Sequence, residues 1–431
     1  MAEGLVIAAP SSGAGKTLVT LGLIAALKRA GHRVAAAKTG PDYIDPRFLE
    51  AASGGAAVNL DPWAMRRALV GALASDAASQ AELLIVEGVM GLFDGPEDGG
   101  GSTADLATIL DLPVILVVDA ARQGQSVAAL VEGFARHRGD CRIAGVILNR
   151  VGSARHRRLA MGAIAGTGIP VLGALPPVPD LALPSRHLGL VQAGEHPDLA
   201  HFVSAAADLI ATHLDLDALM ALAAPLSAGP PVPTIPPPGQ RVAVARDQAF
   251  AFAYPHLLAA WRRAGAALVP FSPLADEAPD AAADAVYLPG GYPELHAGRL
   301  ASASAFLVGL RAAAERGALV YGECGGFMVL GESLTDAEGE AHAMAGLVPV
   351  ATSFADRSLH LGYRRLTHDG ALPWPRALRG HEFHYSTELR RGAGEPLFAA
   401  SDAAGAPLGA MGLRRGTVMG SYAHVVDMEP G

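Results

Sequence analysis

The stretch Leu5-Val-Ile-Ala-Ala-Pro-Ser-Ser-Gly-Ala-Gly-Lys-Thr17 decides how the first part of the chain folds. Its apolar beginning, residues 5–9, has the length and composition of a buried strand. A loop with two glycines follows, and apolar residues then recur at helical spacing until Gly31. A strand, a glycine-bearing loop and a helix that opens with Lys-Thr are the context of a P-loop. The sequence therefore predicts a phosphate-binding loop here.

Two glycines of this loop and the Lys-Thr pair that follows them have expected roles. Gly13 and Gly15 supply a permissive backbone whose N–H groups can cradle phosphate oxygens at a helix N-terminus. Lys16 would reach the β- and γ-phosphates, and the Thr17 hydroxyl would bind Mg²⁺. The usual pattern has a glycine where this chain has Pro10, and we expect Gly13 to provide the freedom instead. A plain glycine-rich turn is the alternative interpretation.

Short apolar runs recur through the first half of the chain, with helical segments between them. This alternation predicts a doubly wound α/β domain whose parallel sheet is buried on both faces. Ligands of such domains bind beyond the carboxyl ends of the strands. Besides the first strand, we expect strands at residues 34–38, 83–86, 114–118, 145–148 and 170–173.

Polar residues follow several of these expected strands. Lys38, Asp42 and Asp45 come after the second, where they could serve phosphate and Mg²⁺ or form a capped turn. Glu87 ends an apolar run in a Walker B arrangement, which holds Mg²⁺ directly or through water, although a chance acid at a strand end is the alternative. Asn149 follows a later strand, and its amide could read the edge of adenine or cap a turn.

Bulk properties exclude several classes of protein. The 431 residues carry a net charge of −9, which disfavours general nucleic-acid binding. Mean hydropathy is +0.29, but no apolar run reaches the roughly 18–20 residues of a membrane span. Two cysteines, Cys141 and Cys324, offer no disulfide framework. We therefore expect a reduced, cytoplasmic protein without a membrane or nucleic-acid partner.

A proline-dense segment divides the chain. Residues 225–240 contain a run of prolines typical of an extended, semi-stiff linker. A second α/β pattern begins after it, with expected strands at residues 241–245, 268–271, 285–289 and 318–322. The sequence thus predicts two domains, 1–224 and 241–431, joined by the linker 225–240.

The second domain carries a candidate nucleophile elbow, Gly322-Glu-Cys324-Gly-Gly326. Its glycines allow the sharp turn from strand to helix that exposes a nucleophile, here Cys324. The helix N-terminus would lower the pKa of the thiol. The backbone N–H of Gly325, with that of Gly291 in an upstream glycine pair, could form an oxyanion hole. A buried structural cysteine is the alternative.

A second polar cluster is Gly380-His-Glu-Phe-His-Tyr-Ser386. Two histidines and a glutamate, His381, Glu382 and His384, could bind a metal, contact substrate or support the structure. His-x-x-His without further ligands is weak evidence for zinc. The three interpretations stay open.

With these motifs in place, the chain resembles the cobyrinate/hydrogenobyrinate a,c-diamide synthase family, corrin-ring amidases of cobalamin synthesis. The resemblance runs nearly end to end, and its most specific segments are residues 38–45, 87–94, 322–326 and 380–386. The first half also resembles dethiobiotin synthetase, and the second half resembles class I glutamine amidotransferases. It implies that 1–224 is an ATP-dependent amidoligase and that 241–431 is a flavodoxin-like glutaminase.

For the second domain, the resemblance implies that Cys324 attacks the side-chain amide of glutamine to form a thioester and free ammonia. His424 would deprotonate the thiol and protonate the leaving ammonia. Class I glutaminases usually place a glutamate two residues after this histidine. Here that position is Val426, followed by Asp427, so a Cys–His dyad and an unidentified third member are both open.

For the first domain, the resemblance implies that a substrate carboxylate attacks the γ-phosphorus of ATP and that ammonia then displaces phosphate. Lys16, Lys38 and Mg²⁺ would hold the charge, with Thr17, Asp45 and Glu87 as metal ligands. Ammonia must cross between the domains, which implies a closed interface or tunnel. The residues expected to place the macrocycle or its carboxylate are Asp42, Tyr43 and Asp94.

The family leaves related substrates open. The resemblance favours hydrogenobyrinate over cobyrinate, while cobyric acid synthase and nickel-sirohydrochlorin a,c-diamide synthase are the alternatives. A CTP-synthase-like enzyme lacks support, and a partition ATPase would carry a lysine where this chain has Ser11. A scaffold with an inactive glutaminase domain disagrees with the intact elbow. The resemblance to dethiobiotin synthetase implies a homodimer.

Overall fold

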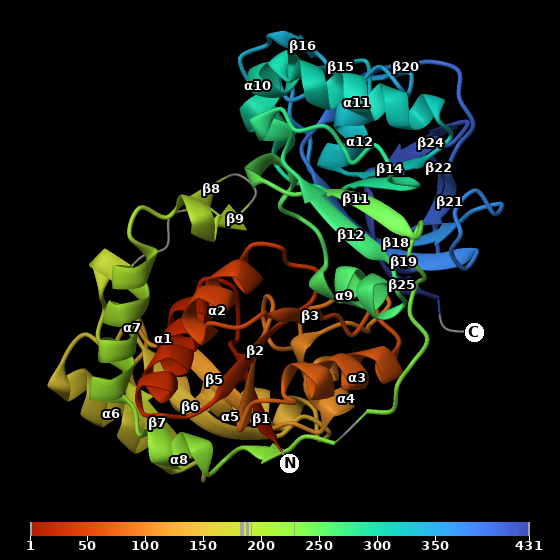
Figure 1. Ribbon diagram of the computed structural model, residues 1–431. Coiled ribbons are helices and arrows are strands. Elements are labelled where there is room, and N and C mark those ends of the chain that lie inside the picture. Colours follow the sequence, from red (N-terminus) through yellow and green to blue (C-terminus); the bar gives the residue numbers. More distant parts are fainter. Residues whose placement is uncertain (1, 182–184, 187–188, 191, 228, 430–431) are drawn as a thin grey trace. The chain divides into compact units, whose positions relative to one another are not determined.

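The computed structural model describes the whole chain except residues 1, 182–184, 187–188, 191, 228 and 430–431 (Figure 1). The chain forms two compact units, Met1–Val232 and Pro233–Gly431. The boundary between them falls inside the segment expected as a linker, 225–240. The first residue of that segment is part of a strand, because Pro225 pairs with Glu3 at the start of the first strand.

The first unit is built on a parallel sheet in the order β3-β2-β4-β1-β5-β6-β7, to which β10 adds an antiparallel partner of β1. Its strands are buried along nearly their whole length, as the continuous apolar runs predicted. The short strand β3 was not predicted from the sequence. The strands are β1 (Glu3–Ala8), β2 (Val34–Thr39), β3 (Val58–Leu60), β4 (Leu83–Glu87), β5 (Val114–Asp119), β6 (Ile143–Asn149), β7 (Val171–Ala174), β10 (Ala224–Pro225) and a separate ribbon, β8 (Ser185–Arg186) with β9 (Gly189–Leu190).

Helices connect these strands. Because β1 is central and the chain winds outward from it in both directions, right-handed crossovers place helices on both faces, which confirms the doubly wound prediction. Gly22 in α1 lets α7 approach closely, since a Cβ there would lie 2.7 Å from the carbonyl oxygen of Ala206. The helices are α1 (Lys16–Arg29), α2 (Asp45–Ser53), α3 (Arg67–Ala77), α4 (Thr103–Leu110), α5 (Val127–His137), α6 (Ala154–Ala165), α7 (Leu199–His213) and α8 (Leu216–Met220), with short turns η1 (Pro179–Leu181) and η2 (Ala193–Glu195).

The second unit contains a parallel sheet in the order β12-β11-β13-β14-β24, with β23 antiparallel at its edge. This is the flavodoxin-like order 2-1-3-4-5, as predicted. The strands are β11 (Arg241–Ala245), β12 (Ala267–Phe271), β13 (Ala285–Leu288), β14 (Leu319–Glu323), β23 (Leu413–Arg415) and β24 (Val418–Ser421), and the helices and turns are η3 (Gln248–Phe250), α9 (Pro255–Arg263), η4 (Pro273–Ala275), η5 (Pro293–His296), α10 (Ala297–Ser302), α11 (Ser304–Glu315) and α12 (Gly325–Leu330).

Two further sheets, which the sequence did not predict, lie between β14 and the C-terminus in the chain. One has the order β16-β15-β17-β20, and the other is the antiparallel sheet β22-β21-β18-β19-β25. The second of these pairs β19 with β25 and so places His381 opposite His424. The strands are β15 (Ser333–Thr335), β16 (Ala341–Ala343), β17 (Val350–Ser353), β18 (His360–Thr367), β19 (Ala377–His384), β20 (Thr387–Arg391), β21 (Phe398–Ser401), β22 (Pro407–Met411) and β25 (Ala423–Met428).

A helix that crosses a membrane must be both long and apolar. Across the residues that the structure describes, none of the helices is both long enough and apolar enough to cross a membrane.

Candidate active sites

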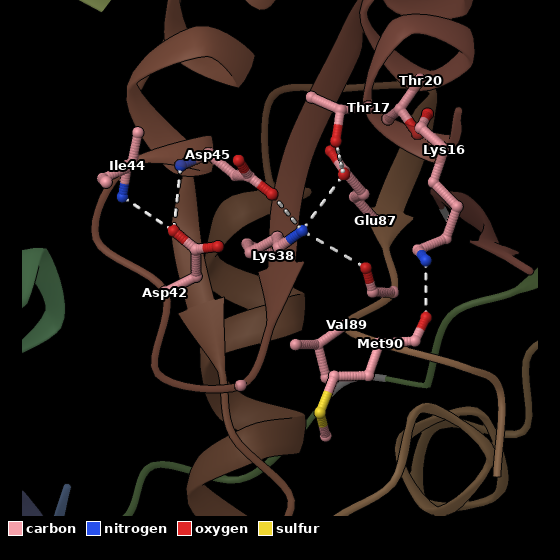
Figure 2. A network of polar contacts seen from close by, with 12 residues as sticks. Lys16, Thr17, Thr20, Lys38, Asp42, Ile44, Asp45, Glu87, Val89 and Met90 are labelled. Carbon is pink, nitrogen blue, oxygen red and sulfur yellow. Dashed lines mark hydrogen bonds and ion pairs between the residues drawn. The ribbon is translucent and has the colours of Figure 1, made fainter. Parts of the chain in front are cut away.

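The loop between β1 and α1 has the backbone that phosphate binding requires. Gly13 and Gly15 adopt φ of 78° and 94°, in the left-handed region that favours glycine, as the sequence predicted. Lys16 is the first residue of α1, so the free N–H groups of the helix start lie at this loop. The Lys16 ammonium donates to the carbonyl oxygen of Met90 at 2.5 Å, which directs the lysine to the segment after β4 (Figure 2).

Lys38, at the end of β2, is the centre of a buried network of charges (Figure 2). Its Nζ donates to Asp45 Oδ2 at 2.5 Å, to Glu87 Oε1 at 3.1 Å and to the carbonyl oxygen of Gly88 at 3.2 Å. The Thr17 hydroxyl donates to the same Glu87 oxygen at 2.7 Å. The structure therefore brings together Lys38 and all three residues expected as metal ligands.

Burial and neighbouring charges shift the pKa values of this network. Burial, and then the nearby Lys38, lower the pKa of Lys16 to about 8. Burial opposes the charged form of Lys38, but Asp45 and Glu87 outweigh it and raise its pKa. Burial raises the pKa of Glu87, against the attraction of Lys38. These opposed shifts mean that Glu87 and Lys38 depend on each other for their charge.

The residues expected to place the substrate have different surroundings. Asp42 Oδ1 accepts from the backbone N–H groups of Ile44 and Asp45 at 2.8 and 3.0 Å, so this carboxylate forms the capped turn that was its alternative interpretation, at the start of α2. Burial raises the pKa of Asp42 to about 7. Tyr43 is buried beside it. Asp94 is exposed, and its Oδ2 accepts from the N–H of Gly91 at 2.9 Å.

Asn149, at the end of β6, packs against the P-loop. Its Nδ2 donates to the carbonyl oxygen of Ala14 at 2.9 Å, and its Oδ1 accepts from the N–H of Arg150. A Cβ on Gly15 would lie 2.2 Å from Asn149 Nδ2, so only glycine fits there. The amide thus supports the loop, and its expected contact with adenine stays a prediction.

Cys324 lies at the turn between β14 and α12 in the second unit. Its φ of 47° and ψ of −106° place a non-glycine residue in a strained conformation, as a nucleophile elbow requires. Gly322 and Gly326 allow the strand and helix to pack closely, since a Cβ on Gly322 would lie 2.8 Å from the backbone of Gly326. The cysteine is buried, and its Sγ lies 3.8 Å from the carbonyl oxygen of Phe383.

His424 lies beside the same elbow. A Cβ on Gly290 would lie 2.8 Å from His424 Nε2 and 3.2 Å from the Cβ of Cys324, so both side chains border one glycine. Burial raises the pKa of the Cys324 thiol, whereas burial and the neighbouring His381 and His384 lower the pKa of His424 to about 3. A neutral thiol thus stands near a neutral imidazole.

Backbone N–H groups also meet at this elbow. The N–H of Gly325 bonds to Cys324, which opposes the rise in the thiol pKa. A Cβ on Gly325 would lie 3.1 Å from the nitrogen of Gly291, so the two expected oxyanion donors are neighbours. Gly291 has no room for a side chain, because a Cβ there would lie 2.0 Å from the carbonyl oxygen of Ala249.

One acidic residue at this site was missed in the sequence. Glu323, the residue before the nucleophile, is 1% exposed, and its Oε2 lies 3.7 Å from His424 Nδ1. An acid at the end of an apolar strand, directly before an elbow, was the available signal. It gave no hint of which histidine it would face, because β14 and β25 are far apart in the sequence.

Known proteins with similar sequences match both units. A CobQ/CobB/MinD/ParA nucleotide binding domain matches residues 5–191, and a CobB/CobQ-like glutamine amidotransferase domain matches residues 241–429. The hydrogenobyrinate a,c-diamide synthase of Brucella anthropi is 59% identical over 99% of this chain and 98% of its own length. The proteins of that name from Brucella suis biovar 1 and Rhizobium meliloti are each 58% identical, over 99% of this chain and 98% and 99% of theirs.

The chain belongs to the hydrogenobyrinate a,c-diamide synthase family.

In this member of the hydrogenobyrinate a,c-diamide synthase family, the cluster on β19 is a network of partnered side chains. His384 Nε2 lies 2.9 Å from Glu382 Oε1, and Ser386 Oγ lies 3.0 Å from His384 Nδ1. Arg364 Nε donates to the other oxygen of Glu382 at 2.7 Å. His360, Glu382 and His384 could together face a metal ion, but the nitrogens of His384 and the oxygens of Glu382 already have protein partners. The geometry favours the structural interpretation of this cluster.

Proposed function

We propose that this protein converts hydrogenobyrinate into its a,c-diamide, using ATP and the side-chain amide of glutamine. The observation that carries the proposal is the similarity of 58–59% identity, over nearly the full length, to proteins of that name. The chain also holds both kinds of chemistry that such a reaction needs. One unit carries a phosphate-binding loop with buried charges, and the other carries a strained cysteine beside a histidine.

In the second unit, Cys324 is the proposed nucleophile and His424 the base. His424 takes the thiol proton as Cys324 attacks the amide carbon of glutamine, and it gives that proton to the departing nitrogen. The N–H groups of Gly291 and Gly325 would bond the oxyanion that forms at the carbonyl. Water then releases glutamate from the thioester, and ammonia becomes available for synthesis.

In the first unit, the P-loop and Lys16 would bind the phosphates of ATP, and Lys38 would balance charge on the transferring group. A ring carboxylate attacks the γ-phosphorus, the bond to the bridging oxygen breaks and ADP leaves, which forms an acyl phosphate. Ammonia then attacks the carbonyl carbon and phosphate leaves, which yields the amide. Asn149 is proposed to hold the P-loop in shape and to contact adenine, and Asp42, Tyr43 and Asp94 to place the substrate.

The residues around Lys38 fit a magnesium ion. Glu87 Oε2 is buried and has no hydrogen-bond partner among the described residues. Together with the Thr17 hydroxyl and the carboxylate of Asp45, it offers the oxygen ligands that Mg²⁺ prefers. Bound Mg²⁺ would neutralise charge on the β- and γ-phosphates. The proposal also includes a cytoplasmic location. It further includes a homodimer, and light scattering of the purified chain would test this oligomeric state.

The direct test is a mass measurement on the ring product. Purified protein receives ATP, Mg²⁺ and glutamine with either hydrogenobyrinate or cobyrinate. The proposal predicts two carboxylate-to-amide conversions on hydrogenobyrinate, with slower turnover of cobyrinate. An absence of conversion on both rings, while glutamine is still hydrolysed, would overturn the assigned substrate.

A further inference from the structure

The glutaminase site lacks an acid at the position where class I enzymes usually carry one. That position, two residues after His424, is Val426, which is fully buried and apolar. An imidazole that takes a proton in a buried site gains from a carboxylate on its far nitrogen, which fixes the tautomer and stabilises the imidazolium. The surroundings of His424 Nδ1 therefore decide whether the site is a dyad.

The two nitrogens of His424 face different groups. The Cε1–Nε2 edge of the ring borders Gly290, where a Cβ would lie 2.3 and 2.8 Å from these two atoms and 3.2 Å from the Cβ of Cys324. Nδ1 lies 3.7 Å from Glu323 Oε2, and both side chains are almost completely buried. The imidazole thus borders the glycine beside the cysteine along one edge and has the carboxylate near Nδ1, an arrangement that suits a triad.

The carboxylate of Glu323 is held in place by three donors. Tyr287 Oη donates to Oε2 at 2.7 Å, Tyr321 Oη donates to Oε1 at 3.2 Å, and the backbone N–H of Val425 donates to Oε1 at 3.0 Å. The last bond ties Glu323 to the residue directly after His424. Hydrogen bonds to both oxygens hold a buried carboxylate in one fixed position.

We propose that Glu323 is the positioning residue of this glutaminase, in place of the acid that the family position lacks. It orients His424 through Nδ1 and stabilises the imidazolium once the Cys324 proton has arrived. The proposal rests on the proposed function, because it assigns a third member to the same catalytic site. Burial raises the pKa of Glu323 to about 7, against the bonds from Val425 and the two tyrosines, so the charged carboxylate is accessible near neutral pH.

The test compares Glu323→Gln with Asp427→Asn in the full chain. Asp427 is the other buried acid near the expected position, and it lies on β25 with His424. Glutamate release is measured with all substrates present. We expect Glu323→Gln to lower kcat by roughly 10²-fold, within the range of acid–base catalysis, with little change in KM for glutamine. Glu323→Asp should give an intermediate kcat, and Asp427→Asn a nearly normal one.

A structural role for Glu323 predicts a different pattern. Loss of local structure would change the fluorescence of Trp261 and Trp374, which pack on Tyr287 and Tyr321. If Glu323→Gln alters this fluorescence, Glu323→Asp becomes the deciding variant, and a wild-type kcat there overturns the proposal.

Three further outcomes separate this proposal from the assignment of the nucleophile. A normal kcat in Glu323→Gln, or the main loss in Asp427→Asn, overturns the role of Glu323 while the proposed function stands. Retained glutamine hydrolysis in Cys324→Ala would instead overturn the assigned nucleophile.

Discussion

The two candidate sites handle burial in opposite ways. Around Lys38, burial is offset by charge, since an ammonium and two carboxylates lie within ion-pair distance of one another. Around Cys324, burial favours neutral forms, because it raises the thiol pKa and lowers the imidazole pKa. The first site is suited to a polyanionic ligand with a cation, and the second to a neutral amide.

Because the two sites differ in this way, the two reactions can be separated by mutation. A buried charged network is destabilised when one member is removed, since the remaining charges are left buried without partners. Removal of the nucleophile from the neutral pair of Cys324 and His424 stops glutamine hydrolysis, but it leaves the charges of the other unit unchanged.

Cys324→Ala should remove glutamine-dependent synthesis, by roughly 10⁴-fold or more, because no other group can form the thioester. Synthesis from added ammonium salt should persist, because the first unit is unchanged. Ring amides are measured by mass spectrometry with either nitrogen source. Cys141→Ala is the matched control, because Cys141 is the other cysteine and should leave both activities intact. Loss of both activities in Cys324→Ala would mean that the cysteine is structural.

Lys16→Ala should reduce synthesis from glutamine and from ammonium alike, by roughly 10³-fold, because a preorganised positive charge at the phosphates is removed. The same assay with both nitrogen sources measures this. Lys28→Ala in the last turn of α1 removes an exposed lysine from the same helix and should have no such effect. Near-normal synthesis by Lys16→Ala would contradict the P-loop assignment.

Asn149→Ala should raise KM for ATP by roughly tenfold, because one hydrogen bond that holds the P-loop backbone is lost. Initial rates at several ATP concentrations provide the measurement. Arg150→Ala is the neighbouring control, since its ion pair with Asp119 is exposed and contributes little. An unchanged KM in Asn149→Ala would show that the loop keeps its shape without this amide.

The smallest effect concerns stability and pH. Burial, and then Arg364, lower the pKa of His381 to about 3, from an unfolded value near 6.5. Between these values the unfolded chain binds a proton that the folded chain does not, so His381 favours unfolding as the pH falls. Removing it in His381→Gln should make the loss of stability shallower, by about 1.4 kcal/mol per pH unit. Urea unfolding at several pH values measures the slope, and identical slopes would refute the prediction.

Much of the fold could be predicted because its signals are local. Continuous apolar runs marked the buried parallel strands, and glycines marked the P-loop and the elbow, where φ angles are positive or the backbone approaches closely. Alternating strands and helices predicted an α/β second domain, and its flavodoxin-like form was implied by the resemblance to class I glutamine amidotransferases. The linker began later than expected, since Pro225 and the buried Leu226 belong to the first unit.

The missed features depend on pairing between distant segments. The short strand β3 and the two additional sheets have no long apolar run of their own. The pairing of β19 with β25, which sets His381 opposite His424, joins residues about forty positions apart in the chain. Glu323 was overlooked for the same reason, because its contact with His424 arises only when β14 and β25 are placed together.

In the proposed reaction, the nitrogen freed at Cys324 is the nitrogen that reaches the ring. The most direct measurement uses glutamine that carries a heavy nitrogen isotope in its side-chain amide, with ATP, Mg²⁺ and hydrogenobyrinate and no added ammonium. The account predicts a diamide product that holds the heavy isotope in both new amides. A product without the isotope, or no amide formation while labelled ammonia accumulates, would contradict it.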